Sequence, residues 1–410
     1  MWQLLLDQIL KKMFAEGSLN AEMPDGSIRH YGDGSGNPVS VSLKDEKTAK
    51  ALVLYPDLAL GEAYMSGGLV IEDDDIDGLI ALAVRNIDHL RNIWWMRPPH
   101  RLRAALRRFS QNNIAPRAQR NVAHHYDLSG ELYDLFLDAD RQYSCAYFQH
   151  PEDTLEQAQA QKKDLIARKL LLEPGMRVLD IGCGWGGMAL ELARNHGVRV
   201  LGVTLSREQL QVARERAAQE GLSDRVDFRL CDYRDLDGSF DRIVSVGMFE
   251  HVGLPHFDTY FQTLRDRLEP DGVALLHTIG WTAEPQATNP WIAKYIFPGG
   301  YVPTMSETMT SIEKARLWAA DVEIWRLHYA HTLRHWRDRF EARQREVRDL
   351  YDERFVRMWR FYLAACEQTF RHGRQAVFQF QLSRKVDAVP LTRDYLYVPE
   401  PETAALSAAE

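Results

Sequence analysis

Apolar residues in the second half of the chain recur in two spacings, one typical of buried strands and one typical of helices. From Gly175 onward, short apolar runs alternate with amphipathic stretches. The expected strands are residues 177–181, 198–204, 226–230, 242–246 and 273–277, and the expected helices are 188–196 and 207–220. Gly197 and Gly221 follow these helices, where a left-handed residue ends a helix at little cost. Because alternating strands and helices form parallel sheets, the sequence predicts an α/β fold with a doubly wound sheet.

The two ends of the chain have other patterns. After Glu307 the sequence is long, charged and helical through about Arg371, and residues 376–382 then alternate, which predicts an antiparallel edge strand. Near the N-terminus, an amphipathic helix is expected at residues 1–14, and a strand-like run at 39–43 follows a glycine-rich stretch. A glycine-rich break between short elements is typical of a small separate module.

These patterns divide the chain into four parts. We expect a small N-terminal module over residues 1–110, a linker over 111–122, a catalytic domain over 123–395 and a flexible tail over 396–410. The acidic run Asp73, Asp74, Asp75 precedes an apolar helix at 79–84. We interpret this run as a solvated N-terminal helix cap rather than a metal site.

Composition excludes several classes of protein. The formal net charge of −8 gives no support to a nucleic-acid partner. The four cysteines have no paired spacing, which disfavours a zinc site and a secreted disulfide framework and fits a reducing cytoplasm. No run approaches the roughly 20 apolar residues of a spanning helix. A basic, aromatic-flanked stretch at residues 97–108 is a candidate for contact with a membrane surface.

A glycine-rich turn lies between the first expected strand and the first expected helix. Asp180 is followed by Gly182, Gly184 and Gly186, a tighter spacing than the dinucleotide fingerprint, and no Walker lysine follows. Glycines at this edge of a parallel sheet let backbone amides approach a ligand. The turn resembles motif I of class I S-adenosylmethionine (SAM) methyltransferases, which implies a SAM site built on these residues.

The next two strand ends complete the expected cofactor site. The second strand lacks the acidic residue typical of such folds, so Thr204 and Gln209 are candidates for neutral hydrogen bonds to the cofactor. Ser206 and Gln209 fit a helix capping box equally well. Asp232 and Tyr233 follow the third strand and are candidates for adenine contact, although Asp232 could equally cap a turn.

Several further segments carry a more specific resemblance. The segments are residues 121–130, 142–147, 247–253, 276–280 and 295–300. In this order they are similar to the cyclopropane fatty acid synthase family and its relatives, the mycolic acid cyclopropane synthases. The resemblance spans about residues 20 to 390, and the N-terminal module also looks like that of the phospholipid-acting bacterial members.

The resemblance implies a reaction and its residues. In that family an alkene attacks the sulfonium methyl group, and the resulting carbocation loses a proton as the ring closes. The implied base is a bound bicarbonate held by positions matching Cys145, Glu250, His277, the Ile279 backbone and Tyr329. The resemblance also places Tyr143 and Ser144 in the cofactor site. A dry pocket and a small base within reach are required by the chemistry itself.

Some of these residues have a structural alternative. A lone cysteine beside aromatics is usually inert core, and only its motif favours a function for Cys145. Glu250 follows a buried strand, where an unpartnered carboxylate is costly, so a functional role is favoured and His251 could orient it. The role of Tyr329 rests on the resemblance alone. Seven aromatic residues suit an acyl channel or a plain core: Tyr295, Phe297, Tyr301, Trp325, Trp359, Phe361 and Tyr362.

The sequence therefore predicts a cyclopropane-fatty-acyl-phospholipid synthase that uses SAM and bicarbonate. The expected partners are an unsaturated phospholipid and a membrane surface, and the resemblance implies a homodimer. The expected location is the cytoplasm, with peripheral binding to the inner face of the membrane. The alternatives are an enzyme that makes methyl- or methylene-branched acyl chains, a small-molecule methyltransferase and a non-catalytic lipid-binding protein.

Overall fold

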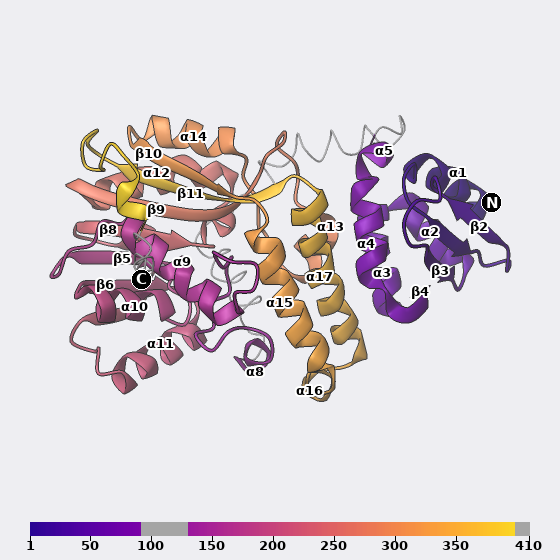
Figure 1. Cartoon of the computed structure of the whole chain (residues 1–410), viewed down its shortest axis with the longest axis horizontal. Helices are drawn as coiled ribbons and strands as arrows, with labels where there is room; N and C mark the ends of the chain where they lie inside the picture. Colours follow the sequence, from indigo (N-terminus) through magenta and orange to yellow (C-terminus); the bar gives the residue numbers. More distant parts are fainter. Residues whose placement is uncertain (92–129, 398–410) are drawn as a thin grey trace, which may run out of the picture.

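The computed structural model describes residues 1–91 and 130–397 of the 410-residue chain. A small β-sheet near the N-terminus and a large β-sheet lie at opposite ends of the molecule (Figure 1). Helices from the C-terminal third of the chain stand between them (Figure 1). The fold therefore has two sheet-containing bodies joined through a helical layer.

The small sheet has four strands in the order β2-β1-β3-β4. The strands are β1 (Leu19–Glu22), β2 (Ile28–Tyr31), β3 (Val39–Leu43) and β4 (Leu69–Ile71). The helices around it are α1 (Trp2–Met13), α2 (Glu46–Leu54), α3 (Pro56–Ser66), α4 (Ile76–Arg85) and α5 (Ile87–Arg91). Asp75 caps α4 by accepting a hydrogen bond from the Gly78 N–H at 2.8 Å, so the predicted helix cap is confirmed.

The large sheet has seven strands in the order β10-β11-β9-β8-β5-β6-β7. The strands are β5 (Arg177–Ile181), β6 (Arg199–Thr204), β7 (Val226–Leu230), β8 (Phe240–Val246), β9 (Leu268–Trp281), β10 (Trp318–Trp325) and β11 (Gln375–Ser383). All neighbouring pairs from β9 to β7 are parallel, which confirms the predicted doubly wound sheet. The strand order reverses between β5 and β8, and α/β folds bind ligands at the carboxyl ends of strands at such a point.

Helices cover both faces of the large sheet because successive strand residues point to opposite sides. Val178 packs in one cluster with α9 (Leu155–Lys169), α10 (Gly187–His196) and α11 (Arg207–Gln219). Leu179, the next residue, packs in the other cluster with α12 (Phe257–Arg267) and α14 (Met305–Lys314). Gly197 and Gly221 follow α10 and α11 with φ of +66° and +67°, so both predicted helix ends are confirmed.

The prediction of one long helical stretch after Glu307 was wrong, because β10 interrupts it. Only Trp325 of β10 is fully buried, and Asp321 and Glu323 lie on this strand. Its exposed and buried positions do not alternate regularly, so the strand period is not visible in the sequence. The helices that follow it are α15 (His328–Ala342), α16 (Gln344–Leu350) and α17 (Glu353–His372).

The prediction that residues 376–382 form an edge strand was also partly wrong. β11 is antiparallel to both of its neighbours, as expected, but it lies between β9 and β10. Gln379 and Gln381, which suggested a solvated face, are each 1% exposed. Gln379 contacts the Lys169 ammonium at 2.6 Å and Gln381 donates to the Lys169 carbonyl at 2.6 Å, so polar partners compensate their burial.

The helical layer joins the two sheets through one continuous apolar core. This core includes residues of α1, α4, α15 and α17 together with α8 (Gly130–Asp134) and α13 (Pro290–Tyr295). Within it, the buried Arg337 of α15 pairs with Asp77 of α4 and with Glu367 of α17, the latter at 3.3 Å. The Arg337 guanidinium therefore ties the N-terminal part of the chain to the helices of the C-terminal part.

Some predictions fall on residues that the structure does not describe. They are the linker at 111–122, the basic stretch at 97–108, most of the motif at 121–130 and nearly all of the C-terminal tail. Among residues 1–91 and 130–397, every helix is too short or too polar to cross a membrane. In the same residues, no group of three or more His, Cys, Asp or Glu side chains is placed to hold a metal ion.

Replacing Arg337 tests the junction between the two parts of the chain. Arg337→Met leaves the fully buried Glu367 with only the Arg371 pair, and we expect the free energy of unfolding to fall by about 3 kcal/mol. The matched control is Arg334→Met, which removes a half-exposed partner of Asp77 at 3.6 Å and should cost less than about 1 kcal/mol. Urea denaturation measures both, and equal losses in the two variants would contradict this account.

Candidate active site

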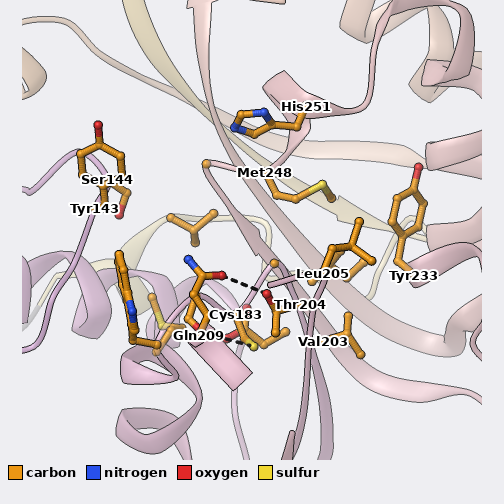
Figure 2. A pocket seen from close by; sticks show the side chains of 18 of the residues that line it. Tyr143, Ser144, Cys183, Val203, Thr204, Leu205, Gln209, Tyr233, Met248 and His251 are labelled. Atoms are coloured by element: carbon orange, nitrogen blue, oxygen red, sulfur yellow. Dashed lines mark hydrogen bonds between the residues drawn. The ribbon is translucent and has the colours of Figure 1, made fainter. Parts of the chain in front are cut away.

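A cavity of about 150 Å³ lies at the carboxyl ends of β5, β6, β7 and β8 (Figure 2). Nine of the ten residues predicted to bind the cofactor line it: Tyr143, Ser144, Asp180, Gly182, Gly184, Thr204, Gln209, Asp232 and Tyr233. The tenth, Gly186, is not part of its lining. The parallel sheet thus brings together residues that are up to 90 positions apart, from Tyr143 to Tyr233.

The three glycines of the turn serve different structural purposes. Gly182 and Gly186 have φ of +79° and +86°, a region that side chains rarely allow. A Cβ atom on Gly182 would lie 2.8 Å from the Met248 side chain, and one on Gly186 would lie 2.7 Å from Phe228. Gly184, with φ of +55°, faces open space. Gly186 therefore allows close packing of the loop, while Gly182 and Gly184 form the cavity wall.

Asp180 and the Thr204–Gln209 pair supply polar atoms to this cavity. Asp180 is 2% exposed, burial raises the pKa of its carboxyl to about 7, and its Oδ2 atom contacts no described donor. Thr204 donates a hydrogen bond to Gln209 Oε1 at 2.9 Å, and Ser206 Oγ accepts one from the Gln209 N–H at 3.3 Å. Ser206 thus caps the helix, but the Gln209 side chain bonds to Thr204 instead of closing a capping box with the Ser206 N–H, which donates to Thr204 Oγ1 at 3.1 Å. Gln209 also lines the cavity, and its contact with the cofactor stays a prediction.

Asp232 caps a turn and also lines the cavity, while its contact with adenine stays a prediction. Its carboxylate caps a short helical turn by accepting the Arg234 N–H at 3.0 Å, and it pairs with the Arg234 guanidinium at 2.6 Å. Burial opposes its ionisation, but the Arg234 contacts prevail and lower the pKa of Asp232. The neighbouring Tyr233 ring is buried against Tyr260, with ring centres 5.4 Å apart. A charged acceptor and an apolar face therefore flank this end of the cavity.

A second cavity, of about 1150 Å³, adjoins the first. All five residues predicted to be catalytic line it: Cys145, Glu250, His277, Ile279 and Tyr329. Four residues line both cavities: Tyr143, Ser144, Gly247 and His251. A ligand in the first cavity and one in the second therefore meet across this shared wall.

Glu250 follows the carboxyl end of β8 and bonds to the end of β9. Its Oε1 accepts a hydrogen bond from the Ile279 N–H at 2.7 Å, so the Ile279 amide is bound to Glu250 in this structure. Burial raises the pKa of Glu250 to about 7. Its Oε2 atom is buried and contacts no described donor. An unpaired, readily protonated carboxyl oxygen in a cavity wall can donate to a ligand as well as accept from it.

His277 has a defined tautomer because the orientation of Gln379 is fixed. Gln379 Oε1 accepts from the Lys169 ammonium, so its Nε2 faces His277 Nδ1 at 3.0 Å and donates to it. The proton of the neutral ring is then on Nε2. Burial, together with the charges of two lysines, lowers the pKa of His277 well below its ordinary value. His277 is therefore a neutral hydrogen-bond donor.

The remaining predicted residues are also neutral or aromatic. Burial raises the pKa of the Cys145 thiol, which contacts the Ala146 carbonyl at 3.3 Å. Tyr329 packs against Trp336 and Phe370. Four of the seven aromatic candidates line the second cavity, namely Phe297, Tyr301, Phe361 and Tyr362. Tyr295, Trp325 and Trp359 do not line it and belong to the surrounding core.

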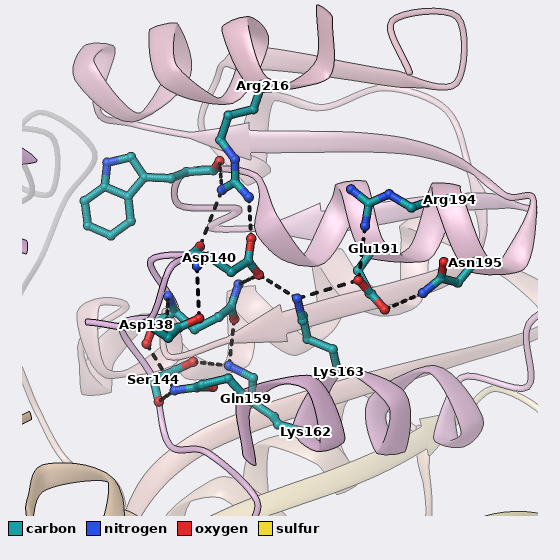
Figure 3. Close-up of polar contacts among 12 residues, drawn as sticks. Asp138, Asp140, Ser144, Gln159, Lys162, Lys163, Glu191, Arg194, Asn195 and Arg216 are labelled. Carbon is teal, nitrogen blue, oxygen red and sulfur yellow. Dashed lines mark hydrogen bonds and ion pairs between the residues drawn. The ribbon is translucent and has the colours of Figure 1, made fainter. Parts of the chain in front are cut away.

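The sequence did not reveal Lys162, a fully buried lysine behind the shared wall (Figure 3). Its ammonium donates to Gln142 Oε1 at 2.7 Å and to Ser144 Oγ at 2.8 Å. Gln159, one turn earlier on α9, donates to the carbonyls of Gln142 and Ser144 at 3.2 and 3.0 Å. Two side chains of α9 therefore fix the backbone and side chains of the segment that carries Tyr143, Ser144 and Cys145.

A second set of contacts ties this segment to the helices of the cofactor site. Asp140 accepts a hydrogen bond from Lys163 at 2.6 Å and pairs with Arg216 of α11 (Figure 3). Arg216 also donates to the Trp185 carbonyl in the glycine-rich turn at 3.0 Å. The segment that separates the two cavities is thus anchored to α9, α11 and the turn.

Comparisons with known proteins agree with this geometry. The family model described as mycolic acid cyclopropane synthetase matches residues 114–380. The chain belongs to this family. A second model, described only as a domain of unknown function, matches residues 5–92 of this cyclopropane synthase family member. As in the rest of the family, the enzyme is SAM-dependent, and its large sheet has the fold of SAM-dependent methyltransferases.

Three relatives illustrate the match. The cyclopropane-fatty-acyl-phospholipid synthase of Escherichia coli K12 is 42% identical over 85% of this chain and 89% of its own. A probable fatty acid methyltransferase of Pseudomonas putida is 41% identical over 77% of this chain and 79% of its own. The structure of mycolic acid cyclopropane synthase CmaA1 complexed with SAH is 34% identical, with a TM-score of 0.62, and covers 64% of this chain and 97% of its own.

Replacing Lys162 tests how the shared wall is held. Lys162→Met removes both hydrogen bonds to the wall. A hydrogen bond to a charged group contributes about 1.5 to 3 kcal/mol, and about 1.4 kcal/mol corresponds to a tenfold change in affinity. We therefore expect the KM for SAM to rise about tenfold. Steady-state kinetics measures this effect. The control is Arg168→Met on the same helix, whose ion pair with Asp164 is at the surface.

A pH series separates this role from a loss of packing. Burial lowers the pKa of Lys162 to about 7, whereas the unfolded chain keeps its proton up to about pH 10.5. Between these values the unfolded state binds the extra proton, so the unfolding free energy of the wild type should rise with pH relative to Lys162→Met. The rise is up to about 1.4 kcal/mol per pH unit. Parallel curves for the two proteins would contradict the assignment.

Proposed function

We propose that this enzyme transfers a methylene group from SAM to the cis double bond of an unsaturated phospholipid acyl chain, as a cyclopropane-fatty-acyl-phospholipid synthase. The observation that carries the proposal is the contact between the two cavities at Tyr143, Ser144, Gly247 and His251. The smaller cavity has the residues of a SAM site, and the larger one is mostly apolar and long enough to admit a chain. The E. coli relative, named for this reaction, supports the same assignment.

The reaction has two bond-forming steps. The π electrons of the acyl double bond form a new bond to the sulfonium methyl carbon, and the sulfur–methyl bond breaks as the sulfur takes its electron pair. The acyl chain then carries a cation on the other former alkene carbon. A C–H bond of the new methyl group breaks, its electrons close the ring onto that carbon, and the proton passes to a base.

The residues of the larger cavity suit this cation. His277 and Cys145 are uncharged, and the aromatic rings of Phe297, Phe361 and Tyr362 exclude water that would capture the cation. The faces of aromatic rings also attract positive charge. The site therefore protects the intermediate without offering it a strong nucleophile.

The base in this proposal is a bicarbonate ion, which when bound supplies a small proton acceptor beside the reacting carbons. The donor His277 Nε2–H and the unpaired Glu250 Oε2 fit such an ion, because they line one cavity and a protonated Glu250 carboxyl can donate from Oε2. Cys145 lines the same cavity, with its Sγ–H directed to the Ala146 carbonyl. Tyr329 lines the same cavity. The Ile279 amide acts through Glu250, whose carboxylate it orients at 2.7 Å.

The second candidate is formation of a methyl- or methylene-branched chain from the same cation. The P. putida relative, named as a probable fatty acid methyltransferase, favours it. The two outcomes differ only in which proton is lost, and this depends on small differences in the placement of the base. A small-molecule acceptor is disfavoured by the size of the larger cavity.

The proposed substrate requires contact with a lipid surface, and helix α1 offers a suitable element. Leu4 and Leu5 of this helix are 60% and 40% exposed, and Lys11 and Lys12 follow in its last turn. Exposed leucines beside lysines are typical of helices that lie at a membrane interface. Homodimer formation remains an expectation from the family resemblance.

Product analysis tests the proposed reaction. Phospholipid with an oleoyl chain is incubated with the protein and methyl-labelled SAM. The lipids are then separated by chromatography, and their masses are measured by mass spectrometry. We expect a gain of one labelled CH₂ in ring form. The same mass in a branched alkene would support the second candidate instead, and no transfer despite SAM binding would refute both.

Glu250→Gln tests the catalytic assignment. The amide has no acidic proton at this position to give to the bicarbonate, so the base loses its placement and we expect product formation to fall by about 100-fold. SAM binding, measured by calorimetry, should change little, because Glu250 lines only the larger cavity. Turnover within a few-fold of the wild type would contradict the role given to Glu250.

A further inference from the structure

The larger cavity extends far beyond the catalytic residues into the N-terminal part of the chain. There it is lined by apolar side chains of α1, the small sheet and α4, among them Leu6, Ile9, Ala21, Leu43 and Ile80. Each of these five is less than 10% exposed, so this part of the cavity has a buried apolar lining. We call it the N-terminal chamber.

A large apolar chamber is unusual inside a domain as small as the N-terminal part of this chain. Protein interiors are close-packed, and an empty apolar void lowers stability because its lining loses contacts. Closed apolar pockets at the boundary between two parts of a chain are typical ligand sites. The N-terminal chamber and the catalytic residues share one cavity, so a single ligand can occupy both.

Two arginines stand at the boundary between the chamber and the catalytic part of the cavity. Arg85 ends α4, which also carries the chamber residues Ile80 and Ala83. Arg374 immediately precedes β11, which pairs with β9, the strand of His277 and Ile279. Both arginines line the cavity and are exposed, and neither forms an ion pair with any residue that the structure describes.

Further contacts place the two arginines near each other. Helix α4, which ends at Arg85, packs against α17, which ends at His372, and burial together with the charges of Arg85 and Arg371 lowers the pKa of His372. Arg374 follows His372 by two residues. Carboxylates of Asp88 and Glu284 also line this part of the cavity, so it is mixed in charge and suits a zwitterionic or anionic group.

We propose that the N-terminal part of the chain holds the second acyl chain of an intact diacyl phospholipid. In this arrangement the reacting chain lies beside Glu250 and His277, the phosphate lies at Arg85 and Arg374, and the other chain fills the N-terminal chamber. The inference rests on the proposed function and extends it by naming the substrate as a whole lipid. It also gives a role to the matched domain of unknown function at residues 5–92.

The arrangement follows from the chemistry of the substrate. The two acyl chains of a phospholipid are joined through one glycerol, so drawing one chain into a closed cavity brings the other to its entrance. Leaving that chain in water would cost about 0.8 kcal/mol for each exposed CH₂. A second apolar chamber beside a phosphate site removes this penalty.

The test fills the chamber and varies the second chain. Ala83→Phe places a ring in the chamber wall, and the matched control is Ala81→Phe, on the same helix at a residue that does not line the cavity. The substrates are phosphatidylethanolamines in detergent micelles, each with one oleoyl chain and either a palmitoyl or an acetyl second chain. The measured quantity is the ratio of kcat/KM for the palmitoyl form to that for the acetyl form.

We expect Ala83→Phe to lower this ratio by about tenfold or more relative to the wild type, because the ring obstructs only the long second chain. Ala81→Phe should keep the wild-type ratio. An unchanged ratio in Ala83→Phe would overturn the proposal. If Ala83→Phe does not fold, as judged by circular dichroism, Leu10→Trp from α1 tests the same chamber from another helix.

The phosphate site has a separate readout. Arg85→Gln combined with Arg374→Gln should raise the KM for the palmitoyl phospholipid about tenfold or more, but not the KM for monooleoylglycerol, which has no phosphate. Equal changes for both substrates would overturn the assignment of these arginines. If the wild type adds no CH₂ to any of these lipids, the proposed function fails. If it does so but the ratios and KM values do not respond, only this inference fails.

Discussion

The hydrogen bond from the Ile279 N–H to the Glu250 carboxylate fixes the place where the two cavities meet. It joins the carboxyl ends of β8 and β9, and these strands are adjacent only because the chain reverses direction in the sheet between β5 and β8. Glu250 and Ile279 face the larger cavity together with His277 and Tyr329, whereas the glycine-rich turn lines the smaller one. The arrangement of the two cavities therefore depends on strand order before it depends on any single side chain.

A second constraint comes from the wall between the cavities. The segment from Gln142 to Cys145 has no regular secondary structure, so its position depends on its polar contacts. A buried lysine and a buried glutamine of α9 supply these contacts from behind, at a cost in desolvation that leaves the lysine barely protonated at neutral pH. Buried polar contacts of this kind are typical of segments that must be held in one defined position.

The sequence predicted the parallel strands and the glycine-rich turn because their signals are local. Apolar runs bounded by glycine identify β5 to β9, and the motifs at Gly182 and Glu250 lie directly at strand ends. β10 was missed because its exposed and buried positions do not alternate with the period of a strand. β11 was misplaced because Gln379 and Gln381 appear solvated until their partner Lys169 is known. Lys162 and the N-terminal chamber depend on contacts between distant segments, which no local pattern records.

The protonation state of Cys145 has a consequence for the survival of the enzyme itself. A sulfonium methyl group is an alkylating agent, and the site holds a cysteine on the segment that borders the methyl donor's cavity. The nucleophilic form of cysteine is the thiolate, and burial raises the pKa of Cys145 against the opposing charge of Lys162, which keeps this form scarce. In the proposed reaction, the burial that keeps this thiol protonated thus also protects the enzyme from methylating its own sulfur and inactivating itself during turnover.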